Sequence, residues 1–448
     1  MGGWPQLREA RTVRSGRAPG TVIRCSTRDE LLSRIPVSIV HFYPHQVPAE
    51  KLAQGLAGAL ETVPIFGGRM RTTGDQMEIV CDDDGVPMEF YTIDETTTEA
   101  IGRVAMPSAG LANHCDALKA REGGLPLLTV RVTEFSDGGI ALCPSFHHSL
   151  GDMQTYILFM QAWSAGVDGH PMPEVTVVED RDAYIDGAVP ADEAGPPSFR
   201  LPSAEEAEVL AAEVQASSRA NRTVQIYFGA AELTRMRDQL AAEAGRQLSI
   251  NDALTAHIHT SIRDLDDYDG PRPISMAVNI RPRLGLPSSV VGNLITDLNL
   301  TCLPQTTAPQ FAAEIRAALE SLGATHPTFR ADQRLIAQLG RDRLDDCVPF
   351  AFDPPRRTLT ISNWTRFGLD EITFGGHRPV LVAPTTAVSL PWVGWLVEGF
   401  DGAGVLLTLV VPVRFASKLR GGDGRAQLHR FRSDDDQLPA LATAGRVI

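Results

Sequence analysis

The chain has 448 residues, of which 43% are hydrophobic and 21% charged, and its formal net charge is −14 at pH 7. This composition is typical of a globular protein and excludes a disordered chain. The negative charge argues against a nucleic-acid-binding protein, which would present a basic face. Because the chain is too long for one ordinary core, we expect two domains, residues 1–190 and 191–448.

The cysteines and the apolar runs indicate where the protein works. Six cysteines are scattered without CxxC pairing, which favours reduced thiols over disulfides or a zinc knuckle. The first residues, MGGWPQLREART, lack the apolar core of a signal peptide. The longest apolar run, residues 404–413, is far too short to cross a membrane. We therefore expect a soluble, cytoplasmic protein without a membrane partner.

The first half of the chain predicts strands alternating with helices. Residues 38–43 alternate as a half-buried strand does, and residues 49–63 form an amphipathic helical pattern that Pro64 ends. Residues 126–135 and 139–146 predict a hairpin, because the turn sequence Ser-Asp-Gly separates two apolar runs.

This hairpin leads into FHHSLGD, residues 146–152, where a buried strand gives way to a predicted apolar helix. Two histidines and an aspartate are costly to bury there without a partner or a chemical role. Because histidine titrates near neutrality, it can take a proton from an alcohol or amine and return it within one turnover. The residues alone leave other readings open: a structural histidine, a zinc or iron site without an evident third ligand, or a nucleophile pair of Cys143 with a histidine.

The second half begins after a stretch rich in proline, glycine and acidic residues, 166–202, which predicts a linker or a long surface crossing between domains. Capping signals at Ser203 and Ser249 each predict the start of a helix. A strand at 274–283 ends in a basic corner. The last third predicts mainly strands, at 359–364, 372–374, 379–382, 395–400 and 405–413, and a loosely ordered polar terminus beyond Gly421.

The order of these motifs resembles the BAHD acyltransferase superfamily, with its fungal and bacterial relatives, and more distantly the condensation domains of nonribosomal peptide synthetases. The resemblance covers nearly the whole chain. His147 adds the double histidine that is typical of condensation domains. The segments that carry the resemblance, in the family's order, are Phe66-Gly67-Gly68-Arg69, the hairpin at 126–146, His148 to Asp152 as HxxxD, residues 249–256, residues 279–283, Gly292-Asn293 and residues 362–379.

The chain departs from the family pattern in two places. Met153 stands where a glycine usually follows the aspartate. In the segment that corresponds to DFGWG, only Phe374, Gly375 and Pro379 match. That segment is mainly architectural in the family and lies away from the catalytic histidine, so we expect the fold to tolerate the change.

The resemblance implies an α/β fold with mixed sheets: two chloramphenicol-acetyltransferase-like domains with a solvent channel between them. Acyl-CoA, a co-substrate and not a permanently bound cofactor, would meet a small-molecule alcohol or amine in this channel. His148 would act as general base. Asp152 would either orient the imidazole or, as the family favours, pair with Arg281 to hold the loop. The implied activity is that of a monomeric acyltransferase of specialised metabolism.

Further candidate residues lie around this centre. Asn363 and Trp364, in the segment 362–364, are candidates for stabilising the oxyanion, and His147 is a secondary candidate within the motif. The helix start at Ser249 offers amide groups to the phosphates of CoA, and Arg283 adds positive charge. No metal is predicted. The alternative to CoA is a carrier protein that bears the acyl donor.

Overall fold

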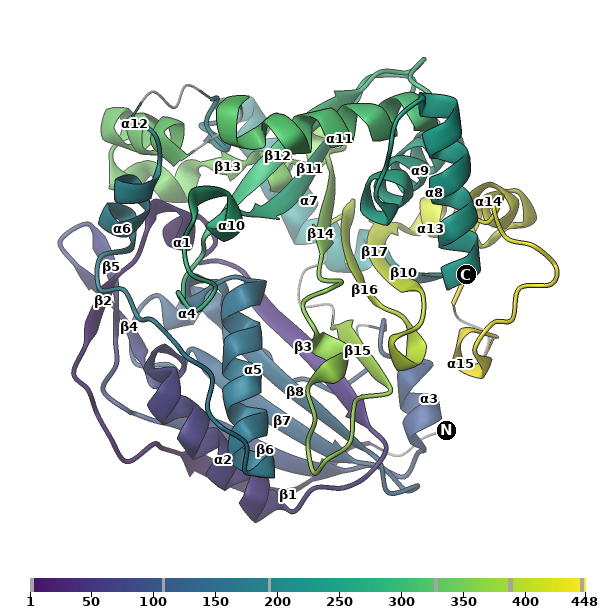
Figure 1. The fold of residues 1–448 in the computed structure, drawn as a ribbon. Helices are drawn as coiled ribbons and strands as arrows, with labels where there is room; N and C mark the ends of the chain where they lie inside the picture. The colour runs from purple at the N-terminus through teal and green to yellow at the C-terminus, as the bar shows by residue number, and fades with distance from the viewer. Residues whose placement is uncertain (1–3, 107–108, 192–194, 326–328, 386–389, 444–446) are drawn as a thin grey trace.

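The computed structural model describes residues 4–106, 109–191, 195–325, 329–385, 390–443 and 447–448. These residues form two six-stranded mixed sheets, one in the lower half and one in the upper half of Figure 1, each packed against helices. Smaller sheets of three and two strands lie beside them. The predicted α/β fold with mixed sheets is therefore confirmed.

The first sheet is built almost entirely from the first half of the chain. Its strands β6 (Val86–Thr92) and β7 (Leu128–Glu134) are parallel, and the other neighbours are antiparallel. The predicted hairpin is confirmed as β7 and β8 (Ile140–His147). Every residue of β8 is buried, because strands flank it on both sides. The strand order is β1 (Gln6–Val13), β6 (Val86–Thr92), β7 (Leu128–Glu134), β8 (Ile140–His147), β3 (Pro36–Tyr43) and β15 (Leu381–Pro384).

Two helices, α2 (Ala49–Thr62) and α5 (Met153–Asp168), lie side by side over this sheet (Figure 1). They come close because glycines face each other: a Cβ on Gly166 would lie 2.8 Å from the Cα of Gly55. Trp163 of α5 closes the contact by donating its Nε1 hydrogen to the carbonyl of Leu52 at 2.9 Å. This packing fixes the direction in which α5 leaves the HxxxD motif.

The second sheet comes wholly from the second half of the chain, and its core includes the buried residues Val224, Ile258 and Leu409. Helices α8 (Ala230–Ala244), α9 (Ile250–Leu265), α11 (Ala308–Thr325) and α13 (Val413–Arg420) pack around it. The strand order is β10 (Asn221–Phe228), β17 (Val405–Pro412), β16 (Val393–Glu398), β14 (Leu359–Asn363), β11 (Arg272–Asn279) and β12 (Ile295–Cys302).

Shorter elements complete the fold. The strands are β2 (Val22–Arg24), β4 (Arg69–Thr73), β5 (Gln76–Val80), β9 (Phe199–Arg200) and β13 (Val348–Pro349). The helices are α1 (Thr27–Leu31), α3 (Thr97–Ile101), α4 (Ala117–Ala120), α6 (Arg181–Ala188), α7 (Ala204–Ala220), α10 (Arg281–Leu284), α12 (Phe329–Leu339), α14 (Gly422–Leu428) and α15 (Ala440–Thr443). Among the described helices, none is long and apolar enough to cross a bilayer.

One strand of the second half crosses to the first sheet. In β15, Leu381 pairs with Phe42 of β3 in antiparallel register. Residues 1–190 thus supply all but one strand of the first sheet, and the domain boundary at residue 190 stays a prediction.

Two segments that were expected to be loose contain helices, and the loose order predicted beyond Gly421 was wrong. Residues 166–202, predicted as a linker or a surface crossing between domains, contain α6, whose Ile185 is 2% exposed. That this segment crosses between domains stays a prediction. The terminus beyond Gly421 forms α14, and its Leu428 and Phe431 are buried in the second core. In both segments a few apolar side chains are sufficient to anchor otherwise polar sequence.

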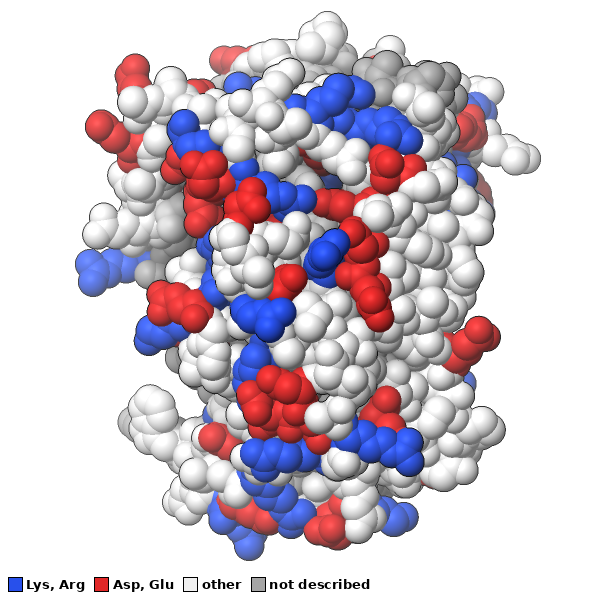
Figure 2. Space-filling model, turned by 90° about the vertical axis from the view of Figure 1, so that its left-hand side faces the viewer, with Lys and Arg blue, Asp and Glu red and all other residues white. Residues whose placement is uncertain are grey.

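On the face that lies to the left in Figure 1, acidic and basic side chains are interspersed (Figure 2).

Candidate active site

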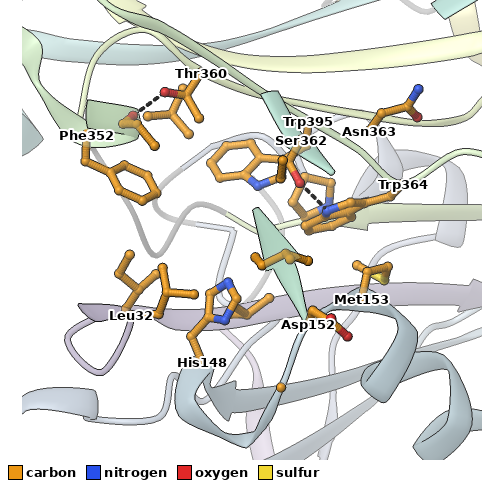
Figure 3. A pocket seen from close by; sticks show the side chains of 18 of the residues that line it. Leu32, His148, Asp152, Met153, Phe352, Thr360, Ser362, Asn363, Trp364 and Trp395 are labelled. Atoms are coloured by element: carbon orange, nitrogen blue, oxygen red, sulfur yellow. Dashed lines mark hydrogen bonds between the residues drawn. The ribbon is translucent and has the colours of Figure 1, made fainter. Parts of the chain in front are cut away.

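His148 stands at the point where β8 ends. A short 3-10 turn, His148–Leu150, follows the strand, and the backbone N–H of His148 donates to the carbonyl of Ile35 at 3.0 Å. The side chain lines a cavity of about 150 Å³ to which both halves of the chain contribute (Figure 3). The first half supplies His148 together with Leu32, Val37, Phe146 and Met153, and the second half supplies Phe352, Thr360, Ser362, Asn363, Trp364 and Trp395.

The imidazole of His148 is suited to act as a base. Burial lowers the pKa of His148 below its ordinary value of 6.5, and its own backbone carbonyl and the Asp152 carboxylate oppose this only in part. The neutral form therefore predominates at pH 7. Its Nδ1 is buried without a hydrogen-bond partner among the described residues. A neutral imidazole at the wall of a cavity can accept a proton from a bound alcohol or amine.

Asp152 does not use its carboxylate to hold His148. Oδ2 accepts from Nη1 of Arg281 at 2.7 Å and Oδ1 accepts from Nη2 at 3.2 Å, a bidentate pair. The same carboxylate caps α5 by accepting from the backbone N–H of Thr155 at 3.1 Å, and accepts from that of Leu294 at 3.0 Å. Among the described contacts, none joins it to the imidazole of His148.

Arg281 extends this connection into the second half of the chain. Its guanidinium also donates to the backbone carbonyls of Val290, at 3.0 and 2.9 Å, and Gly292, at 3.0 Å. Arg281 is 1% exposed and Asp152 4% exposed. Because both charges are buried, each depends on the other for compensation. The pair fastens the start of α5 to the segment that precedes β12.

Gly151 makes this turn sterically feasible. A Cβ at position 151 would lie 2.5 Å from the Cβ of Thr155, closer than carbon atoms approach without a bond. Thr155 cannot easily move away, since its hydroxyl donates to the carbonyl of Gly292 at 3.1 Å and accepts from the N–H of Gly292 at 2.9 Å. The glycine therefore allows the motif to pack against α5.

Comparison with known proteins identifies the family of this chain. A family model described as the Transferase family matches residues 15–413. The chain belongs to this family, the BAHD acyltransferases. A limonoid 1-O-acetyltransferase from Citrus sinensis is 23% identical over 444 residues, which cover 93% of this chain and 94% of the relative.

Solved structures have the same fold. The TRI101 protein of F. sporotrichioides, complexed with coenzyme A and T-2, matches with a TM-score of 0.71 and 16% identity, covering 90% of this chain and 98% of that one. A condensation domain from the Monacolin K polyketide synthase MokA matches with a TM-score of 0.56 and 13% identity, covering 95% and 96%. The protein is an acyltransferase of the BAHD family.

In this BAHD acyltransferase His147, the histidine that precedes His148, does not line the cavity. His147 is fully buried; its Nε2 lies 3.2 Å from the carbonyl of Ala117, and its Nδ1 accepts from the N–H of Ser149 at 3.2 Å. Burial lowers the pKa of His147 to about 4. Its two nitrogens thus tie the motif to α4 and to the following turn.

The predicted oxyanion segment lies across the cavity from His148 (Figure 3). Trp364 donates its Nε1 hydrogen to the hydroxyl of Ser362 at 2.9 Å. Asn363 is engaged on both sides of its amide: its Nδ2 donates to Asn251 at 2.6 Å, and its Oδ1 accepts from the N–H of Thr365 at 2.8 Å. Ser362, which accepts from Trp364, keeps its own hydroxyl hydrogen to donate.

The residues predicted to hold CoA do not line this cavity. Ser249 caps α9 in a capping box with Asp252, whose carboxylate also accepts from Arg316 at 2.7 Å. A negative charge therefore already occupies the helix start that was expected to receive phosphate. Arg283 donates to the carbonyl of Leu319 at 2.9 Å and lines a second, smaller cavity.

Two other readings of the motif find little support. Burial raises the pKa of Cys143 to about 12, so its thiol stays protonated and is a poor nucleophile. Within the part of the chain that the structure describes, no group of three or more histidine, cysteine or carboxylate side chains could hold a metal ion.

The residues that hold the backbone of the motif are not evident from the sequence. Asn293 donates its Nδ2 hydrogens to the carbonyl of His148 and to Asp29, both at 2.7 Å. Arg181 donates to Asp29 at 3.0 Å, and to the carbonyls of Ser149 at 2.8 Å and Leu150 at 3.1 Å. Asn293 was noted only as part of a family landmark, and Arg181 lies in a stretch that reads as a linker.

Proposed function

We propose that this acyltransferase moves an acyl group from a CoA thioester to a hydroxyl or amine of a small, largely apolar metabolite, with His148 as general base. The observation that carries the proposal is the neutral imidazole on the wall of a mainly apolar cavity between the two sheets. The names of its relatives support the choice of donor and acceptor: one is a limonoid 1-O-acetyltransferase, and TRI101 was crystallised with coenzyme A and T-2.

The proposed reaction needs no covalent enzyme intermediate, because the thioester is already activated. His148 takes the proton of the acceptor as its oxygen or nitrogen attacks the thioester carbonyl carbon. The tetrahedral intermediate then collapses, the carbon–sulfur bond breaks, and His148 returns the proton to the departing thiolate to give free CoA. General base catalysis of this kind contributes roughly 10²–10⁴-fold.

Ser362 is the proposed donor to the developing oxyanion. Its hydroxyl lines the cavity and accepts from Trp364, which orients its remaining hydrogen. Removing one such donor typically lowers kcat by roughly 10²–10³-fold in well-studied enzymes. Asp152, fully engaged with Arg281 and the start of α5, is proposed as a positioning residue.

The test is acceptor-dependent release of free CoA from acetyl-, malonyl- and aroyl-CoA, followed with a thiol reagent. His148→Ala should lower this release by roughly 10²–10⁴-fold with an unchanged melting temperature. Release that persists in a folded His148→Ala protein would refute the role of His148.

The second candidate is a condensation-type enzyme that takes its acyl donor from a carrier protein. The double histidine of the motif and the fold shared with the condensation domain favour it. Transfer from an acyl-loaded carrier protein, with no transfer from any free CoA thioester, would establish this candidate and exclude the first. Transfer from free CoA thioesters would do the reverse.

A further inference from the structure

A second cavity adjoins the one that contains His148. Its volume is about 50 Å³, and its wall is mainly apolar, with Ile185, Val189, Leu284 and Leu322 among the lining residues. Asn293, which holds the carbonyl of His148, also lines it. The second cavity therefore lies directly beside the turn that carries the proposed base.

Arg28 lies where the two cavities adjoin. Arg28 and Ile295 are the residues that line both. Two carboxylates hold the guanidinium: Nη1 donates to Asp297 at 2.7 Å, and Nη2 lies 3.4 Å from Asp332. Asp297 lines the first cavity and Asp332 lines the second. A flexible side chain that ion pairs hold in place, and not backbone alone, therefore lies between the two cavities.

The ion pairs at this partition are buried. The side chain of Arg28 is 8% exposed, and those of Asp297 and Asp332 are 8% and 5% exposed. Asp332 is also held by Ser198, whose N–H and hydroxyl each donate to it at 2.6 Å. Because a buried ion pair can often be replaced by uncharged residues without loss of stability, these charges are not required by packing alone.

We propose that the second cavity is a subsite for the distal end of an apolar chain carried by a substrate, and that Arg28 is the specificity-determining residue that limits how far the chain extends beyond His148. The inference rests on the proposed acyl transfer. The chain belongs either to the acyl group or to the acceptor, since both meet at His148. An apolar wall favours each additional buried methylene group by roughly fourfold in binding.

The opened variant is Arg28→Leu with Asp297→Asn, which removes the guanidinium and the charge at position 297. Asp332 loses its contact with Arg28 but keeps the two hydrogen bonds that Ser198 donates. Arg28→Lys is a milder form: it keeps the positive charge but replaces the broad guanidinium with a compact ammonium group. The matched control is Arg200→Leu with Asp353→Asn. That change removes another Arg–Asp pair, at 3.1 Å, whose aspartate is buried and whose arginine is partly exposed, and Arg200 and Asp353 line neither cavity.

The assay is kcat/KM along two series of straight-chain substrates. The first series pairs acyl-CoA thioesters of two to ten carbons with one alcohol, and the second pairs acetyl-CoA with alcohols of two to ten carbons. In the opened variant the preference for eight carbons over two should rise by roughly tenfold or more in one series, and that series identifies the source of the chain. Adding Val189→Phe, which fills the second cavity, should remove the gain. The control should keep the wild-type profile.

The inference is overturned if the folded variant retains the wild-type profile in both series, if the control shows the same gain, or if Val189→Phe leaves the gain in place. If the double variant does not fold, Arg28→Lys is measured instead. A smaller rise in the preference for eight carbons over two supports the inference, and an unchanged preference overturns it. Wild-type turnover that requires His148 reports separately on the proposed function. Without any turnover, the subsite is judged by whether 1-octanol raises the melting temperature of the opened variant more than that of the wild type.

Discussion

Replacing Asp152 with asparagine is expected to weaken the folded state far more than it slows the chemical step. Asparagine has the same size and remains a good N-cap for α5, so the change isolates the charge of the carboxylate. Arg281 would then be a cation at 1% exposure whose remaining partners are carbonyl oxygens and the Asn279 amide. Removing one partner of a buried ion pair typically costs about 3–5 kcal/mol.

This loss is large beside the roughly 5–15 kcal/mol that stabilises a typical native protein. For a folding unit of about 150–250 residues, each kcal/mol lowers Tm by roughly 2–4 °C. We therefore expect Tm to fall by roughly 6–20 °C, measured by differential scanning fluorimetry and circular dichroism. Turnover, measured well below the new Tm, should stay within about tenfold of wild type, because the imidazole of His148 loses no hydrogen bond.

Asp353→Asn is the control, since it removes the charge of a buried carboxylate that pairs with the partly exposed Arg200, and neither residue lines the His148 cavity. It should lower Tm and leave kcat unchanged. If Asp152 instead oriented the imidazole, Asp152→Asn would keep its Tm and lose roughly 10⁴-fold in kcat, as the aspartate of a hydrolase triad does. That result would refute the structural role.

Three further outcomes are expected. Because burial lowers the pKa of His148 and the neutral form is the base, kcat/KM should begin to fall only below pH 6.5; an acid limb at or above 6.5 would contradict this. Burial lowers the pKa of His147 to about 4, so its contribution to stability is present above pH 6.5 and is lost, by roughly 3 kcal/mol, as pH falls toward 4. His147→Asn should reduce the pH dependence of Tm in that range, to which the buried His257 also contributes, and an unchanged slope would count against it. Gly151→Ala should destabilise by roughly 1–3 kcal/mol through its clash with Thr155, whereas Gly187→Ala, where a Cβ meets nothing within 4 Å, should not.

The parts of the fold that could be predicted are those set by neighbouring residues. The β7–β8 hairpin and helix α5 follow from local periodicity and turn chemistry. Local pattern does not identify a distant partner, however. Nothing in residues 379–382 indicates that the strand found there would pair with β3, more than 300 positions earlier, because alternation shows that a segment is a strand and not where it docks.

The order of the terminus beyond Gly421 could not be predicted from its composition. Its polar composition and its position at the end of the chain predict loose order. Two apolar side chains, Leu428 and Phe431, nevertheless anchor it, and the carbonyl of Leu428 lies 2.7 Å from Nε2 of the buried His257. Composition averages over a segment, whereas docking depends on the few side chains that find a complementary site.

The motif predicts where the candidate site lies, but it does not by itself show which of its two histidines lines the cavity. His147 and His148 are adjacent, and at the end of a strand adjacent side chains point in opposite directions. One of them must therefore enter the protein interior while the other enters the cavity, and the spacing to Asp152 agrees with the choice of His148. The two environments differ: His147 binds Ala117 and Ser149, whereas His148 lines open space.

What the sequence could not reveal is how many distant segments hold that turn. Asp29 from α1, Arg181 from α6 and Asn293 before β12 meet around its backbone, and no spacing links them. Each compensates a polar group that burial would otherwise leave unpaired: Arg181 binds two carbonyls, and Asn293 binds the third. A base that must stay neutral and fixed beside an apolar cavity needs such a network, because burial removes the carbonyls of the turn from bulk solvent. The reactive histidine is thus local in sequence, while the conditions that make it a base are assembled only by folding.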